Sequence, residues 1–78
     1  MSEAVILAIR DAIEGAIPEA DLEVFGGGGH YTVQVISPVF AGKKMLESHK
    51  LVYAAIAHLM QGENAPVHAI DQLRTATP

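Results

Sequence analysis

Four consecutive glycines at positions 26–29 separate two short segments that have the composition of β-strands. Residues 22–25 form the first segment, and residues 30–36 form the second, in which apolar and polar side chains alternate as in a strand with one buried face. Two strands joined by a glycine-rich loop predict a β-hairpin. The structural interpretation of the glycines is a turn that needs positive φ angles, and a flexible functional loop is the alternative.

A helix is predicted on each side of the hairpin. The first has an apolar stripe at helical spacing and ends before Pro18. The second is expected from about Lys43 to about Gln61, with Gly62 as its C-terminal cap. The side chains expected in the buried stripes are Ile6, Ile9, Ile13 and Ile17 in the first helix, and Leu46, His49, Tyr53, Ile56 and Met60 in the second.

Two further segments complete the order of elements. Residues 39–42 are expected to form a turn or a single helical turn, and residues 67–75 a final strand. The order α-β-β-(short α)-α-β predicts an α+β fold in which helices cover one face of a three-stranded sheet. A chain of 78 residues is expected to fold as one domain with a small core.

Composition excludes several classes of function. The absence of cysteine excludes disulfides, thiolate catalysis and metal sites built from the chain's own thiolates. We see no signal peptide and no apolar run long enough to span a bilayer, so a cytoplasmic protein without a membrane segment is expected. The net charge of −4 argues against a broad electrostatic grip on nucleic acid, but Lys43, Lys44 and Lys50 form a local basic cluster.

Neither phosphate-binding motif fits the glycine run or its surroundings. Residues 37–44 depart from the Walker A pattern at Ser37 and Lys44, and residues 26–31 depart from the dinucleotide fingerprint at Tyr31. The glycines also lead into a strand, so no helix N-terminus follows them. No nucleophile stands beside a base, and Glu47 and Asp71 are interpreted as isolated solvated charges, so we expect a protein that is not an enzyme.

The four histidines have different expected roles. His49 falls on the apolar stripe of the second helix and is predicted to be packed, whereas His58 is predicted to be solvated. His30 and His68 each stand at the start of a strand, where a partner or a metal ion can reach them. Taken alone, each of these two is more often a surface or capping residue. Together they supply at most half of a metal site.

Three motifs resemble those of the BolA family. The segment FAGKKMLESHKLVY at residues 40–53 resembles the family's F-x-G…H-[RK]-x-V-Y signature. VHAI at residues 67–70 and TATP at residues 75–78 resemble its closing V-H-A-[LI]…T-x-[TS]-P pattern, and GHY at residues 29–31 is similar to its G-S-H-F entry to the second strand. The resemblance covers nearly the whole chain, and the short acidic sequence is similar to the IbaG-like bacterial branch.

The resemblance implies that residues 1–78 form a single BolA-like domain with an α-β-β-α-α-β fold, similar to a type II KH domain. It implies partnership with monothiol glutaredoxins in holding and passing on a [2Fe-2S] cluster, for a chain that is a monomer or weak homodimer alone. Transcriptional regulation through DNA is the second implied role, for which Lys43, Lys44 and Lys50 are the candidate contacts. KH domains grip nucleic acid through a G-x-x-G loop, but residues 40–44 contain only Gly42.

The resemblance also implies ligands for the cluster. The histidine of the V-H-A motif is the family's recurring ligand, which corresponds to His68. The second ligand of the family lies in the loop between the first two strands, at a spacing that falls on Gly27. We therefore predict that His30, the nearest imidazole, takes this role. The glutaredoxin and its glutathione are expected to supply the sulfur, since mixed His/Cys ligation suits a [2Fe-2S] cluster.

Overall fold

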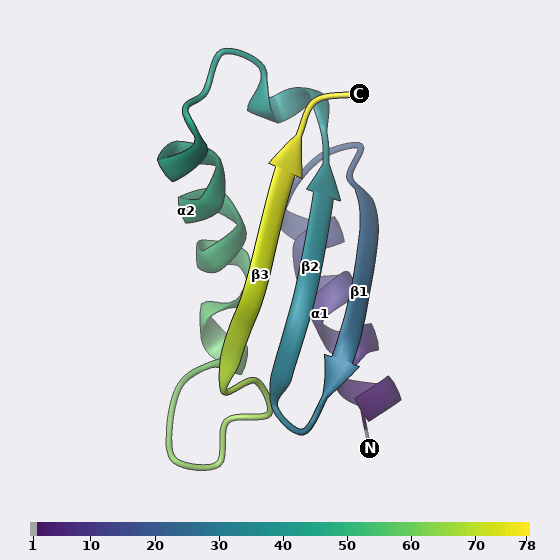
Figure 1. Cartoon of the computed structure of the whole chain (residues 1–78), viewed down its shortest axis with the longest axis vertical. Coiled ribbons are helices and arrows are strands. Elements are labelled where there is room, and N and C mark those ends of the chain that lie inside the picture. The colour runs from purple at the N-terminus through teal and green to yellow at the C-terminus, as the bar shows by residue number, and fades with distance from the viewer. Residues whose placement is uncertain (1) are drawn as a thin grey trace.

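The computed structural model describes residues 2–78 as two α-helices, two short 3₁₀-helices and a three-stranded sheet. The elements in chain order are α1 (Ser2–Ala16), β1 (Asp21–Gly27), β2 (His30–Ile36), η1 (Pro38–Phe40), α2 (Met45–Ile56), η2 (Ala57–Leu59) and β3 (Ala69–Ala76). Both α-helices lie on one face of the sheet (Figure 1). The predicted α+β class and the predicted order of elements are confirmed.

The sheet has the strand order β1-β2-β3 and mixes the two pairing modes. β1 and β2 pair antiparallel as a hairpin, and β2 and β3 pair parallel after the crossover through α2. The pairing of β2 with β3 shifts by one residue between Tyr31 and Thr32, so that Tyr31 faces Ile70 but Thr32 faces Gln72. Such a bulge redirects the extra residue of the longer strand, which here is Asp71.

The core lies between the helices and the inner face of the sheet. Tyr31, Val33 and Val35 alternate inward along β2 and are at most 2% exposed. The predicted stripe of α1 is confirmed, because its isoleucines pack against this face and only Ile6 is partly exposed. No helix in residues 2–78 has the length and apolar character needed to cross a lipid bilayer.

The buried face of α2 differs from the predicted one. Leu46 and Tyr53 were expected inside, but they are 66% and 39% exposed, whereas Ser48 and Val52 are buried and Ile56 is buried as predicted. His49 and Met60 are partly buried. Apolar residues occur around most of this helix, so its sequence contains more than one stripe at helical spacing. The stripe that is buried consists of Ser48, Val52 and Ile56, which have smaller side chains than the predicted one.

The ends of α2 also differ from the prediction. The helix begins at Met45 and its α-helical part ends at Ile56, after which η2 continues the chain to Leu59. The predicted span from Lys43 to Gln61 was therefore too long at both ends. Gly62 has a φ of +87° and follows η2 rather than α2, so it ends the helical segment as a left-handed residue.

Ser37 joins three segments at the end of the sheet where β2 and β3 finish. Its hydroxyl donates to the carbonyl oxygen of Pro18 at 2.6 Å and accepts from the Val39 N–H at 3.2 Å. Its own N–H donates to the carbonyl oxygen of Ala76 at 2.9 Å. The side chain is fully buried, so these bonds satisfy a polar group that would otherwise destabilise the core.

Two substitutions on α2 test which face of the helix is buried. Ile56→Val removes one methylene from a fully buried side chain, and we expect it to lower the free energy of unfolding by about 1 kcal/mol. Leu46→Ala removes more atoms from an exposed side chain, and we expect less than about 0.5 kcal/mol. The measurement is urea-induced unfolding followed by circular dichroism. A larger loss for Leu46→Ala would contradict the observed packing.

Candidate functional site

The glycine run forms the end of β1 and a two-residue turn. Gly27 pairs with His30, so only Gly28 and Gly29 lie between the strands. Their φ angles are +63° and +86°, as type I′ hairpin turns require. Gly26 has a φ of +133°, and a Cβ there would collide with the His30 carbonyl oxygen and lie 2.8 Å from Tyr31 Cα. The prediction that the glycines provide positive φ angles is therefore confirmed for Gly26, Gly28 and Gly29.

Gly29 connects this turn to the start of β3. Its carbonyl oxygen accepts from the N–H of His68 at 2.8 Å and from the N–H of Ala69 at 3.0 Å. A Cβ on Gly29 would lie 2.9 Å from Cγ of His68, so the imidazole rests directly against this glycine. The hairpin turn and the chain entering β3 therefore meet at one end of the sheet (Figure 1).

His30 and His68 are brought to this same end. His30 opens β2 and pairs with Ala69, the residue that follows His68. Both imidazoles are on exposed residues. Within residues 2–78, no three side chains of His, Asp or Glu form a ready-made metal site. The structure thus places the two predicted ligands on adjoining segments, and their role as ligands stays a prediction.

The pairing of Gly27 with His30 bears on the choice of His30. Residues directly opposite each other in an antiparallel pair project on the same face, with Cβ atoms about 4.5–5.5 Å apart. The resemblance places the family's second ligand at Gly27, and His30 is its cross-strand partner. The His30 imidazole therefore projects on the same face of the sheet as a side chain at position 27 would.

Asp71 orients the imidazole of His30. The Nδ1 atom of His30 lies 3.0 Å from Oδ1 of Asp71, and the two side chains are 57% and 55% exposed. An ionised carboxylate only accepts hydrogen bonds, so Nδ1 donates, and in the neutral ring the lone pair of Nε2 is then left available. Asp71 is therefore not the isolated charge that the sequence suggested. Sequence reasoning missed it because the bulge in β3 sets its direction.

The other two histidines lie away from this end. His58 is exposed on η2, as predicted. His49 is partly buried on α2 and lines a shallow cavity with Leu73 and Arg74. The prediction that His49 packs against the protein is confirmed only in part, because the stripe on which it was placed is not the buried one.

The three candidate DNA-contacting lysines are all exposed. Lys43 and Lys44 precede α2, and Lys50 lies in its second turn. Glu47 stands among them, and its Oε1 accepts from the Lys44 N–H at 3.3 Å, which adds an acidic group to the cluster. Their contact with DNA stays a prediction.

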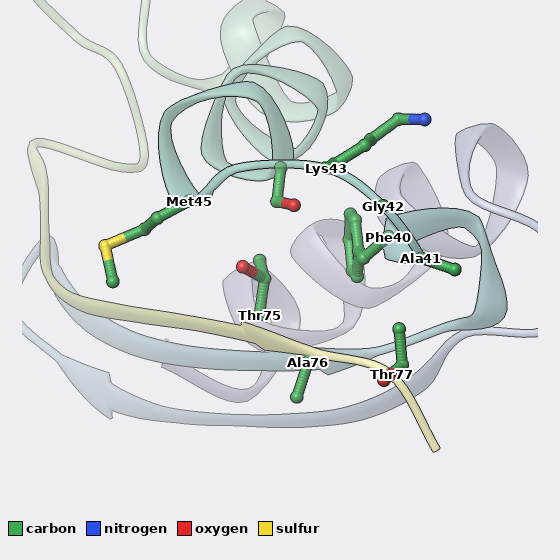
Figure 2. Close-up of a pocket in the computed structure, with 9 residues that line it drawn as sticks. Phe40, Ala41, Gly42, Lys43, Met45, Thr75, Ala76 and Thr77 are labelled. Carbon is green, nitrogen blue, oxygen red and sulfur yellow. The ribbon is translucent and has the colours of Figure 1, made fainter.

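Sequence reasoning also missed a pocket beside Lys43. Its lining comes from the turn before α2, the first turns of α2 and the end of β3 (Figure 2). These segments are about thirty residues apart in sequence, so no local motif marks the pocket.

Two glycine substitutions test the contact between the turn and His68. Gly28→Ala and Gly29→Ala both introduce strain at a positive φ, but only Gly29→Ala places a methyl group against the His68 ring. We expect Gly29→Ala to shift the His68 imidazole resonances, and Gly28→Ala to leave them near their original positions. Heteronuclear NMR of the histidine side chains measures this. Equal shifts in both variants would show that the contact is not present in solution.

The His30 tautomer tests the role of Asp71. Long-range ¹H–¹⁵N correlation spectra, recorded where the imidazole is neutral, should show the proton of His30 on Nδ1. We expect Asp71→Ala to reduce the population of this tautomer, and Glu63→Ala, an exposed acid in the loop before β3, to leave it unchanged. A proton on Nε2 in the unmodified protein would contradict the assigned hydrogen bond.

Comparisons with known proteins agree on one family. The family model described as BolA-like protein matches residues 7–78. Human BolA-like protein 1 is 35% identical over 81 aligned positions that cover 91% of this chain, and Protein BOLA2 of Arabidopsis thaliana is 34% identical over 58 that cover 73%. The chain spans 56% and 58% of the lengths of these two relatives.

A solved structure shows the same fold. The bolA protein homologue from Coxiella burnetii superposes with a TM-score of 0.74 at 35% identity, covering 90% of this chain and 86% of that one. The similarity therefore extends over most of the chain.

Proposed function

The chain belongs to the BolA-like family, and from this premise we propose that it is a non-enzymatic partner of a monothiol glutaredoxin in binding and passing on a [2Fe-2S] cluster. The observation that carries the proposal is the position of His30 and His68, which Gly29 brings to one exposed end of the sheet. The proposed setting is the cytoplasm, with the chain a monomer or weak homodimer when alone.

The donor set fits a shared cluster. The chain has no cysteine, so every thiolate must come from another molecule, and a glutaredoxin with its glutathione supplies two. Neutral imidazole is the ligand that the chain can add, and combined His/Cys ligation raises the cluster potential relative to ligation by thiolates alone. His30 and His68 together supply the two nitrogen ligands that complete the coordination of such a cluster.

Asp71 contributes to this role through His30. A metal-binding histidine commonly donates its other ring N–H to a carboxylate, which fixes the ring and the tautomer. The bond from His30 Nδ1 to Asp71 matches this arrangement and directs Nε2 away from the carboxylate. His30 is thereby held in an orientation suited to binding before any partner arrives.

The surroundings of the two histidines suit docking of a protein. Phe25 is 56% exposed, and it projects on the same face of β1 as Gly27. An exposed aromatic residue near the ligands gives a partner an apolar contact beside the cluster. The partner is thus held by contacts other than the iron ligands, which matters for the choice of experiment.

Histidine substitutions in the complex test the proposal. We expect His68→Ala to abolish, and His30→Ala to weaken, the visible absorption and circular dichroism of the mixed cluster formed with a monothiol glutaredoxin. His49→Gln is the matched control, because His49 lies near the opposite end of β3, and its spectrum should be unchanged. Calorimetry without iron measures docking separately. An unchanged cluster spectrum for His68→Ala would refute the assignment.

A further inference from the structure

A pocket of about 520 Å³ lies at the end of the sheet opposite His30 and His68. Its walls are residues 40–43 of the turn before α2, Met45 and Ser48 of α2, and residues 75–77 at the end of β3 (Figure 2). The ring of Phe40, which is 4% exposed, forms an apolar wall. Lys43 is the one charged residue among the lining residues.

The N-terminus of α2 contributes backbone donors. The first hydrogen bond of this 12-residue helix runs from the Ser48 N–H to the Lys44 carbonyl oxygen at 3.0 Å. The N–H groups of Met45 and Leu46 precede it and have no partner within the helix. Such groups carry partial positive charge and favour an anion. Glu47 occupies only the N–H of Lys44.

Ser48 is the second feature that indicates a ligand. It is 3% exposed, yet no described residue hydrogen-bonds to its hydroxyl group. Within residues 2–78, no polar side-chain atom is both closed off from solvent and unpartnered. The hydroxyl of Ser48 therefore opens into the pocket that this residue lines. A hydroxyl that faces a pocket without a protein partner is suited to a ligand acceptor.

The opposite wall adds further donors. Figure 2 shows the Thr75 side chain projecting from β3 toward the start of α2, with Thr77 beyond it. In the same view the ammonium group of Lys43 points away from the cavity. Its side chain is long and exposed, so it is free to rotate about its bonds.

We propose that this pocket binds a phosphorylated small molecule, with the phosphate at the N-terminus of α2. The Met45 and Leu46 N–H groups and the hydroxyls of Ser48 and Thr75 donate to the phosphate oxygens, Lys43 closes over them, and the organic part lies against Phe40. The volume is in the range of small-molecule sites. A net charge of −4 disfavours a polyanion, so a single phosphate suits this chain better than nucleic acid.

Ligand titrations test the proposal. The probes are inorganic phosphate, ribose 5-phosphate, ribose and a DNA duplex, added to the ¹⁵N-labelled protein. We expect ribose 5-phosphate to shift the amide resonances of Met45 and Leu46 with saturation, and inorganic phosphate to shift them more weakly. Ribose should shift neither. Saturable binding of the duplex alone, or no saturable shift with any probe, would overturn the proposal.

Three variants locate the site. Ser48→Ala and Lys43→Gln should each weaken binding of ribose 5-phosphate about tenfold, since each removes one donor to a charged group. Lys50→Gln is the matched lysine control and should leave the affinity unchanged. His68→Ala should also leave it unchanged, because the pocket and the proposed cluster ligands lie at opposite ends of the sheet. Equal weakening by Lys50→Gln would indicate general attraction of anions and would contradict the assigned pocket.

Discussion

The carbonyl oxygen of Gly29 joins the hairpin turn to the start of β3. It accepts from two successive N–H groups, those of His68 and Ala69, where the chain returns from the helical layer to the sheet. The same glycine ends the hairpin turn at a positive φ and leaves room for the His68 ring. One residue thus sets the turn, the start of the parallel pairing and the position of an imidazole.

Ser37 has the corresponding structural role at the other end of the sheet. Its hydrogen bonds tie the end of β3 to the segments on either side of the hairpin. The turn before α2 is thereby held beside the last residues of β3, and a pocket forms between them. The two ends of β3 therefore carry separate groups of polar side chains, and a ligand bound at one end would leave the other accessible.

The sequence predicts the features that depend on neighbouring residues. The hairpin follows from the glycines between two alternating segments, and the buried face of α1 follows from isoleucines at regular spacing. The buried face of α2 does not follow, because apolar residues such as Leu46 occur around the helix and only packing against the sheet decides among them. The bond from His30 to Asp71 depends on a bulge in β3, which the amino-acid order does not reveal.

The proposed use of imidazoles as cluster ligands has a physical consequence for passing a cluster on. A neutral imidazole adds no negative charge to the cluster, whereas a thiolate does, so replacing thiolates by imidazoles leaves the complex easier to reduce. Both histidines lie on exposed residues at the rim of the sheet, outside the core that stabilises the fold. The coordination proposed for them would therefore form and break while the packing of Ile9, Val33 and Ile56 stays intact. Such separation of ligands from the core is what a reversible cluster partner requires.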